Sequence, residues 1–256
     1  MARRTVTARG LAAAGTVAVL VAGLGACASA DEDKDPDHKT FALPGSTLTV
    51  DADDSALEIV AADEHAPGKI EVTRWFKGSV VVGSDPEVSW SMDGDRLKLR
   101  MKCSGVVADC AAKHRVEVPR GVTVAVKTDD GSVRASGFRD PLDIRTADGS
   151  VRVGDTTGPL TLHSDDGSLR ADVSSRRVEA TTKDGSIRLA LGTVPDRVET
   201  RSDDGSVTVD LPPATYKVSA DSDDGSVHVS VPRNDTSTHV VTARTQDGKV
   251  TVRTAN

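Results

Sequence analysis

Aspartate pairs recur along the second half of this 256-residue chain, and their carboxylates are the groups most able to bind a cation. If equivalent pairs stack, carboxylates would lie about 5 Å apart, and a bridging calcium ion would offset their repulsion. Asp165, Asp203 and Asp223 would line such an edge, although Lys183 interrupts it and would repel a cation. The alternative is that the second aspartate of each pair builds a turn and the first is solvated. The pairs are Asp129-Asp130, Asp165-Asp166, Asp203-Asp204 and Asp223-Asp224.

The six histidines form no comparable cluster, because none has a second histidine two or four residues away. His163-Ser164-Asp165 has the residue types of a catalytic triad, but consecutive residues of a strand point to opposite faces and cannot converge. The G-x-S-x-G, P-loop and H-E-x-x-H motifs do not occur. The sequence therefore predicts a protein that is not an enzyme and has no cofactor apart from the calcium considered above.

The amino-acid composition excludes one class of binding partner and one class of protein. The net charge is −7 and aromatic residues make up 2% of the chain, so the basic footprint that nucleic acid requires is missing. A charged fraction of 28% is too high for a membrane protein with many spans. We therefore expect neither a nucleic-acid partner nor a membrane protein with many spans.

Residues 1–26 have the features of an export signal. Arg3, Arg4 and Arg9 precede an uncharged stretch, residues 11–26, which is shorter than the roughly 20 residues of a spanning helix. The sequence Leu-Gly-Ala-Cys that ends at Cys27 resembles the lipobox of bacterial lipoproteins. That resemblance implies cleavage before Cys27, acylation of its thiol and anchoring to the outer face of the cell membrane. An ordinary signal peptide with a chance cysteine is the alternative, and Arg3-Arg4 leaves Sec and twin-arginine export both open.

Residues 27–40 would then hold the lipidated cysteine and a disordered acidic tether, because they are polar and lack apolar periodicity. Export also bears on the two remaining cysteines. Cys103 and Cys110 enclose only six residues, and disulfides persist outside the cytoplasm. We predict a Cys103–Cys110 disulfide, with two free buried thiols as the alternative.

The chain repeats itself from residue 122 to residue 256. Seven Asp-Gly pairs follow one another at spacings of 18, 18, 18, 20, 20 and 23 residues. Apolar residues alternate with polar ones on both sides of each pair, so each unit is a strand, a turn and a strand with one buried face. The Asp-Gly turns are Asp130-Gly131, Asp148-Gly149, Asp166-Gly167, Asp184-Gly185, Asp204-Gly205, Asp224-Gly225 and Asp247-Gly248.

Two all-β architectures fit these units. Asp-Gly between alternating strands favours an antiparallel hairpin meander. A hydroxyl residue two positions before every turn aspartate, from Thr128 to Thr245, favours instead a parallel β-solenoid in which each unit stacks above the preceding one. We predict the solenoid. In the turns, glycine would supply a positive φ, and the aspartate would accept from the backbone N–H two residues on.

The outward-facing residues of the repeat include a regular series of arginines: Arg134, Arg152, Arg170 and Arg188. We expect them to keep the surface soluble and to pair with nearby acidic residues, each pair contributing little. Residues 41–121 look like a β-rich capping part, whose first strands repeat the rhythm without the glycine. This part contains Trp75, Phe76 and Trp90, half of the aromatic residues.

The chain resembles the bacterial putative-adhesin family, whose domain has no established function. The resemblance rests on Phe41 to Ile59, on Val116 to Gly137 and on the serial Asp-Gly-Ser turns, and it covers nearly all of residues 41–256. It implies a solenoid-like β-fold and an envelope location, and it supplies no catalytic residue. The sequence thus predicts a membrane-anchored, non-catalytic interaction or scaffold module for an envelope protein or glycan. A calcium-dependent binder of cell-wall or extracellular polysaccharide is the alternative.

Overall fold

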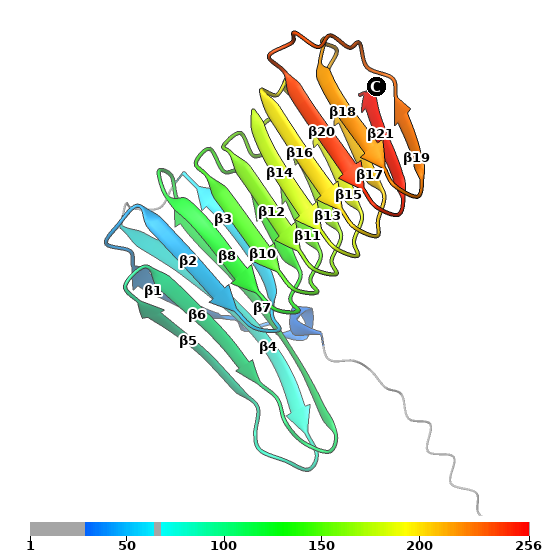
Figure 1. Cartoon of the computed structure of the whole chain (residues 1–256). Helices are drawn as coiled ribbons and strands as arrows, with labels where there is room; N and C mark the ends of the chain where they lie inside the picture. Colours follow the sequence, from blue (N-terminus) through cyan, green and yellow to red (C-terminus); the bar gives the residue numbers. More distant parts are fainter. Residues whose placement is uncertain (1–28, 64–67, 256) are drawn as a thin grey trace, which may run out of the picture.

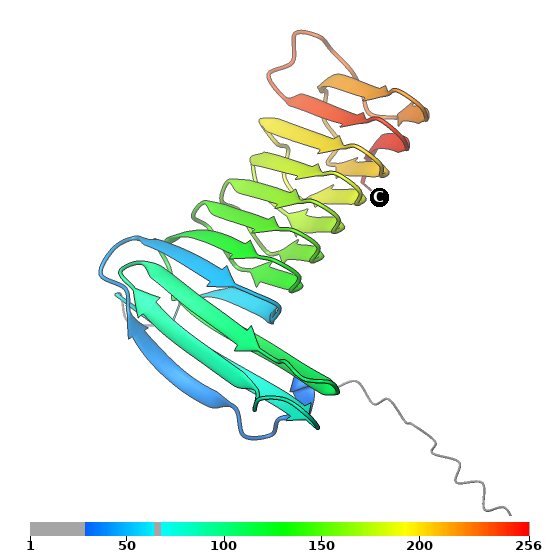
Figure 2. The same cartoon turned by 60° about the horizontal axis from the view of Figure 1, so that its bottom comes forward.

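The computed structural model describes residues 29–63 and 68–255, which form two long β-sheets facing each other along a rod (Figures 1 and 2). Sheet 1 has eleven strands in the order β1-β4-β7-β3-β9-β11-β13-β15-β17-β21-β19, and sheet 2 has ten in the order β18-β20-β16-β14-β12-β10-β8-β2-β6-β5. A short 3-10 helix, η1 (Ala30–Glu32), precedes them. Among the described residues, no helix is long and apolar enough to cross a membrane.

The strand bounds are as follows. Sheet 1 contains β1 (Asp37–Ala42), β3 (Ala56–Ala62), β4 (Lys69–Val80), β7 (Ala108–Pro119), β9 (Val133–Ser136), β11 (Val151–Gly154), β13 (Leu169–Val173), β15 (Ile187–Leu191), β17 (Val207–Leu211), β19 (Ser226–Val229) and β21 (Lys249–Thr254). Sheet 2 contains β2 (Thr47–Ala52), β5 (Glu87–Asp93), β6 (Arg96–Lys102), β8 (Thr123–Thr128), β10 (Leu142–Thr146), β12 (Leu160–Ser164), β14 (Arg177–Thr182), β16 (Arg197–Ser202), β18 (Lys217–Ser222) and β20 (Val240–Thr245).

Each repeat unit is one coil of a parallel solenoid, as predicted. Its first strand lies in sheet 2 and its second in sheet 1, and both pair in parallel with the equivalent strands of neighbouring units. Ile144 faces Val126 on one side and Leu162 on the other, and all three are buried between the sheets. Like residues therefore stack on like residues, and this register builds a continuous apolar core. The antiparallel meander does not occur in the repeat.

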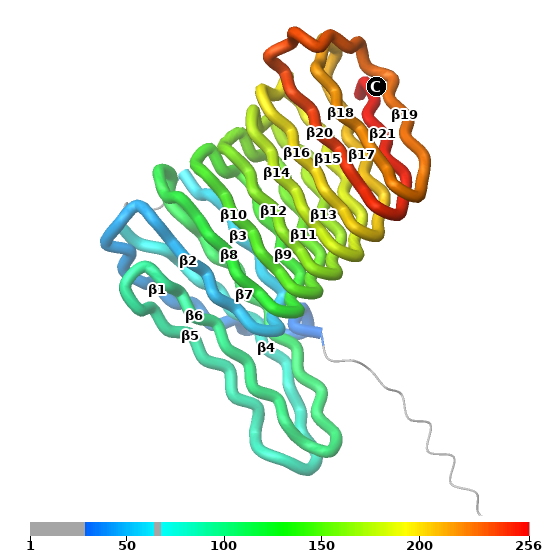
Figure 3. Tube along the Cα trace, viewed as in Figure 1, coloured from blue at the N-terminus to red at the C-terminus, as the bar shows by residue number. Residues whose placement is uncertain are grey.

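The prediction that the units stack in sequence order is wrong for the last two. The seventh unit, β20 and β21, inserts between the fifth unit and the sixth, so β18 and β19 form the end of the rod (Figure 3). A long connection, residues 230–239, carries the chain back past the sixth unit. Tyr216 anchors it, because its backbone N–H donates to Pro232 and its carbonyl accepts from Asn234. The longer spacing of the last unit provides this connection.

The N-terminal part joins the rod without a break. Strands β2 and β3 pair in parallel with β8 and β9, so the first strands of the capping part form one more coil without the Asp-Gly turn. Beyond this coil the sheets continue as antiparallel strands, β4 with β7 and β1 in sheet 1, and β5 with β6 in sheet 2.

Order begins earlier than the predicted tether boundary at residue 40. Strand β1 starts at Asp37, and η1 lies against β4 and β7. Arg74 on β4 holds Asp37 in an ion pair of 2.6 Å, and the carboxylate of Asp33 accepts from the backbone N–H of Phe76. These residues are polar and mostly exposed, so backbone pairing and ion pairs order them, and hydropathy could not have revealed it.

Candidate binding face and turn edge

The turn edge is built by the hydroxyl residues rather than by the aspartates. Thr146 Oγ1 donates to the carbonyl of Asp129 in the preceding coil at 3.0 Å and accepts from the backbone N–H of Gly149 at 3.0 Å. Ser164 repeats both bonds one coil further along. In the described part of the chain, no turn aspartate accepts from the N–H two residues on, so that expectation is wrong. The hydroxyl side chain is closer to these groups, because it faces the interior of the coil.

The turn glycines serve a different purpose from the one expected. Among the turn glycines, only Gly248 has a positive φ, of 153°. At Gly149 an added Cβ would lie 2.1 Å from the carbonyl oxygen of Gly131, and at Gly167 it would lie 2.2 Å from that of Gly149. Successive turns therefore stack so closely that no side chain fits between them. Close approach, and not backbone conformation, requires glycine here.

The second aspartate of each pair forms an uninterrupted ladder on this edge. Backbone hydrogen bonds join each turn to the one before it, including the inserted one. Desolvation, together with the carboxylates of Asp130 and Asp166, raises the pKa of Asp148. A hydrogen bond with Asp166, followed by desolvation, raises the pKa of Asp184. The side chains thus repel one another along the rod. In spatial order the ladder is Asp130, Asp148, Asp166, Asp184, Asp204, Asp247 and Asp224.

The three aspartates predicted for a calcium edge are not brought together. The coil that carries Lys183 separates Asp165 from Asp203, and the coil that carries Gln246 separates Asp203 from Asp223. Lys183 Nζ lies 2.9 Å from Asp165, and its hydrogen bond lowers the pKa of that carboxyl. Gln246 Nε2 donates to Asp203 at 3.0 Å. Within residues 29–63 and 68–255, no three acidic, histidine or cysteine side chains are grouped to hold a metal ion.

The outer face of sheet 1 carries an arginine ladder, defined here as Arg134, Arg152, Arg170 and Arg188. The parallel register places these residues directly beside one another on β9, β11, β13 and β15, about 4.8 Å from strand to strand. A shallow groove of about 590 Å³ runs along the first three, and its lining also includes two carboxylates, Glu58 and Asp172.

Three of the four ladder guanidiniums have no partner among the residues that the structure describes. Arg188 lies 3.6 Å from Asp210, which Arg253 also contacts at 2.5 Å. In the described structure, Arg134, Arg152 and Arg170 make no side-chain hydrogen bond or ion pair. The expectation that the series pairs with nearby acids is therefore wrong for these three. The register gives Arg152 and Arg170 an arginine on each side. Arg134 lies between Arg152 and Glu58, but the carboxylate of Glu58 contacts Arg115 instead, at 2.9 Å.

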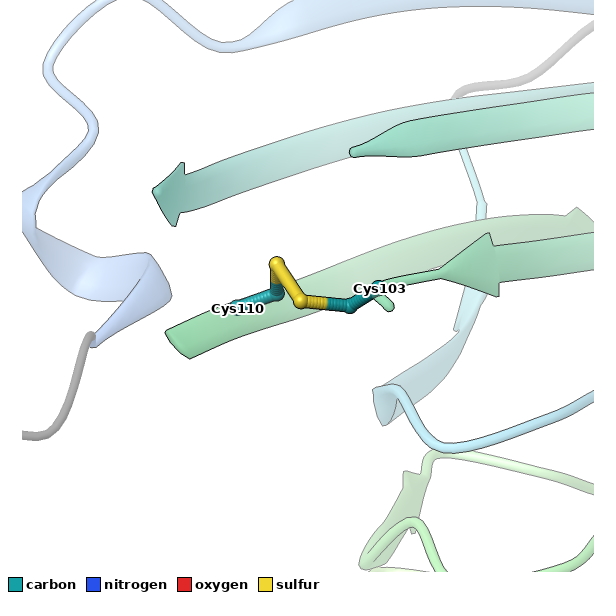
Figure 4. The surroundings of a disulfide bond; sticks show 2 residues. All are labelled: Cys103 and Cys110. Atoms are coloured by element: carbon teal, nitrogen blue, oxygen red, sulfur yellow. A yellow bond between two sulfur atoms is a disulfide. The ribbon is translucent and has the colours of Figure 1, made fainter. Parts of the chain in front are cut away.

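Cys103 and Cys110 form the predicted disulfide, with an S–S distance of 2.01 Å (Figure 4). It connects the segment that leaves sheet 2 after β6 with the beginning of β7 in sheet 1. Cys27, the predicted lipidation site, lies outside the described residues.

The histidines occupy unrelated places. Ser164 is buried in the turn edge, whereas His163 Nε2 lies 3.6 Å from Asp165, so these residues do not form a triad. His114 is fully buried, and desolvation, with a smaller contribution from Arg74, lowers its pKa to about 4. Its Nδ1 lies 3.2 Å from Ser55 Oγ. No motif in the sequence singles out His114. The one available signal is its place in the period-two pattern of β7, at a buried position.

Comparison with known proteins supports the resemblance and the fold. A putative adhesin from Bacteroides fragilis NCTC 9343 matches 87% of this chain and 98% of its own, at 13% identity and a TM-score of 0.53. A putative adhesin from Parabacteroides distasonis ATCC 8503 matches 86% and 97%, at 12% identity and a TM-score of 0.49. A search of curated proteins finds no match. The family model described as Toastrack DUF4097 matches residues 109–256, more than half of the chain. The chain belongs to this Toastrack family.

Proposed function

We propose that the protein is an exported, non-catalytic interaction module, anchored to the outer face of the cell membrane through lipidated Cys27. Its binding face is the arginine ladder, and its partner is an anionic polysaccharide of the cell envelope. The unpaired guanidiniums of Arg134, Arg152 and Arg170 carry the proposal.

The ladder is notable because the rest of the chain is acidic. Acidic residues exceed Lys and Arg by seven. Other exposed arginines, such as Arg145, Arg197 and Arg201, each form an ion pair with a carboxylate. Three adjacent guanidiniums without such a partner repel one another, and an anionic ligand would relieve that repulsion. Guanidinium binds carboxylate or phosphate through paired, charge-assisted hydrogen bonds.

The regular spacing favours a polymer over a small anion. The ladder repeats at the strand spacing, about 4.8 Å, along an open groove and not in a closed pocket. A linear polysaccharide with one carboxylate on each sugar presents equally regular charges. The flat outer surface of a solenoid suits an extended ligand of this kind.

The anchor rests on the sequence and on the disulfide. The residues before Cys27 have the lipobox pattern, and the Cys103–Cys110 disulfide belongs to a compartment outside the cytoplasm. Mass spectrometry of the purified full-length protein tests the anchor directly. A diacylglycerol-modified N-terminal cysteine is expected, whereas an unmodified Cys27 would contradict it.

Titration with polygalacturonate tests the binding face. We expect the Arg134→Gln, Arg152→Gln, Arg170→Gln triple variant to bind at least about tenfold more weakly than the unaltered protein, because each charge-assisted bond contributes about 1.5–3 kcal/mol. The matched control changes Arg145, Arg177 and Arg197 to Gln on sheet 2, which alters the net charge equally. Equal weakening by both triple variants, or no binding by the unaltered protein, would contradict the proposal.

A further inference from the structure

Four exposed valines gather at one end of the molecule, where β4 passes into β5 and β6 passes into β7. We call this the valine tip, comprising Val81, Val82, Val106 and Val107. Their exposures are 74%, 60%, 81% and 58%. The fifth large apolar residue exposed in the described structure, Val227, is 45% exposed and lies in β19, at the opposite end of the rod. In Figures 1 and 2 the strands that carry the tip project away from the rod.

The valine tip is an ordered structure. Val81 N–H donates to Val107 at 2.9 Å, and Val106 N–H donates to Val82 at 2.7 Å. A Cβ at Gly105 would lie 2.6 Å from the carbonyl oxygen of Val82, so glycine is needed for the two segments to approach. The Cys103–Cys110 disulfide closes the base of the same segment (Figure 4). The apolar side chains are therefore held outward by paired backbone and a covalent bond.

The described chain begins beside the strands that carry this tip. Asp33 accepts from the N–H of Phe76 on β4 at 3.0 Å, and Asp31 lies 3.0 Å from Lys113 Nζ on β7. Val81 follows Phe76 by five residues, about 17 Å along an extended strand. Cys27 precedes Ser29 by only two residues, and an extended chain spans at most about 3.6 Å for each residue. A lipid on Cys27 thus places the bilayer surface near β4 and β7.

We infer that the valine tip enters the boundary between head groups and acyl chains of the bilayer that holds the Cys27 lipid. This inference rests on the lipid anchor of the proposed function. The residues next to the anchor, from Asp31 to Asp35, are mainly acidic, so electrostatic attraction to anionic lipid does not hold the tip down. Apolar burial does so, and a second contact converts a single-point anchor into a fixed orientation of the rod.

Tryptophan quenching in vesicles tests the contact. The full chain, purified in its lipid-modified form, is reconstituted in phosphatidylcholine vesicles that contain phosphatidylcholine with brominated acyl chains. Val107→Trp places a reporter in the tip, and Val227→Trp places a matched reporter at the far end. The contributions of Trp75 and Trp90 are removed by subtracting the signal of the unaltered protein. We expect at least twofold quenching and a blue shift for Val107→Trp and neither for Val227→Trp, independent of salt and of added phosphatidylglycerol.

Flotation of the same vesicles separates the two proposals. Protein that floats but shows equal or no quenching at the two sites overturns the valine-tip contact and leaves the anchor intact. A blue shift of Val107→Trp without quenching indicates that the tip contacts a second copy or another protein, and it also overturns the inference. Protein that does not float overturns the anchor and the tip contact together.

Discussion

A Cβ atom placed on Gly149 would lie 2.1 Å from the carbonyl oxygen of Gly131, one coil below it. Real Cβ atoms do not approach a carbonyl this closely, so the backbone of one turn must move if glycine is replaced. The same relationship recurs at Gly167, Gly185 and Gly205. It explains why the Asp-Gly corner accepts no side chain at the glycine position.

Gly149→Ala is therefore expected to destabilise the protein by several kcal/mol, in the range of severe packing changes. Gly154→Ala is the matched control, since nothing lies within 4 Å of its added Cβ and its φ is not in the left-handed region. Thermal unfolding of the two variants should show a large loss in Tm for the first and little change or a gain for the second. Similar values of Tm for both would contradict the close-stacking explanation.

His114 should make stability fall in mild acid. Its pKa is about 4 in the folded protein and about 6.5 when unfolded, so the unfolded state binds the proton more readily between these values. The stability associated with neutral His114 is present above about pH 6.5 and is lost as the pH falls to about 4, by about 3 kcal/mol. Denaturant unfolding of His114→Gln should show a flatter pH profile over this interval.

The control for this prediction is His38→Gln, because His38 is exposed on β1. It should retain the pH profile of the unaltered protein. If the free energy of unfolding of His114→Gln depended on pH as steeply as that of the unaltered protein, the loss of stability in acid would arise from other titratable side chains.

Asp148→Asn should raise Tm at neutral pH, because it removes one charge from a ladder in which neighbouring carboxylates repel. The pKa of Asp148 is raised by folding, so the folded protein binds its proton more tightly than the unfolded chain. The unaltered protein should thus gain stability as the pH falls through this raised pKa, and the advantage of the variant should shrink. Asp172→Asn, on the outer face of β13, is the control and should not show this pattern. A lower Tm for Asp148→Asn at pH 7 would argue against repulsion along the ladder.

Millimolar calcium should raise Tm no more than magnesium at the same ionic strength. Calcium requires six to eight converging oxygens, whereas the turn aspartates form a single row along the rod. In addition, Lys183 already contacts Asp165, and Gln246 already contacts Asp203. Thermal unfolding followed by circular dichroism, with each cation and then with chelator, measures this. A rise specific to calcium would restore the calcium-dependent alternative.

The sequence was sufficient to predict the repeated part of the fold, because the register of the strands follows from the pattern of residues that every unit shares. Parallel stacking places equivalent residues such as Val126, Ile144 and Leu162 side by side, and the hydroxyl residue repeated before every turn indicates that arrangement. The period-two pattern identifies the strands, but it does not specify which unit lies beside which. The insertion of β20 and β21 between the fifth and sixth units depends on the connection around Tyr216, which no local pattern encodes.

The candidate binding face is visible in the sequence as a series of arginines, but the sequence alone predicts an ordinary solvated surface there. Three arginines of this face differ from other surface arginines because, in the described structure, their side chains have no acidic partner, and only the three-dimensional arrangement reveals this. Arg170 has an arginine on each side, whereas Arg188 reaches Asp210. The valine tip likewise depends on two segments, residues 81–82 and 106–107, that are distant in the sequence and meet through backbone hydrogen bonds.

Amide hydrogen exchange in the presence and absence of polygalacturonate tests the proposed binding face most directly, because it locates the ligand. We expect slower exchange in peptides that cover β9, β11 and β13, with little change in β8, β10 and β12 on the opposite sheet. Protection confined to sheet 2 or to the turn edge, with β9, β11 and β13 unchanged, would contradict it.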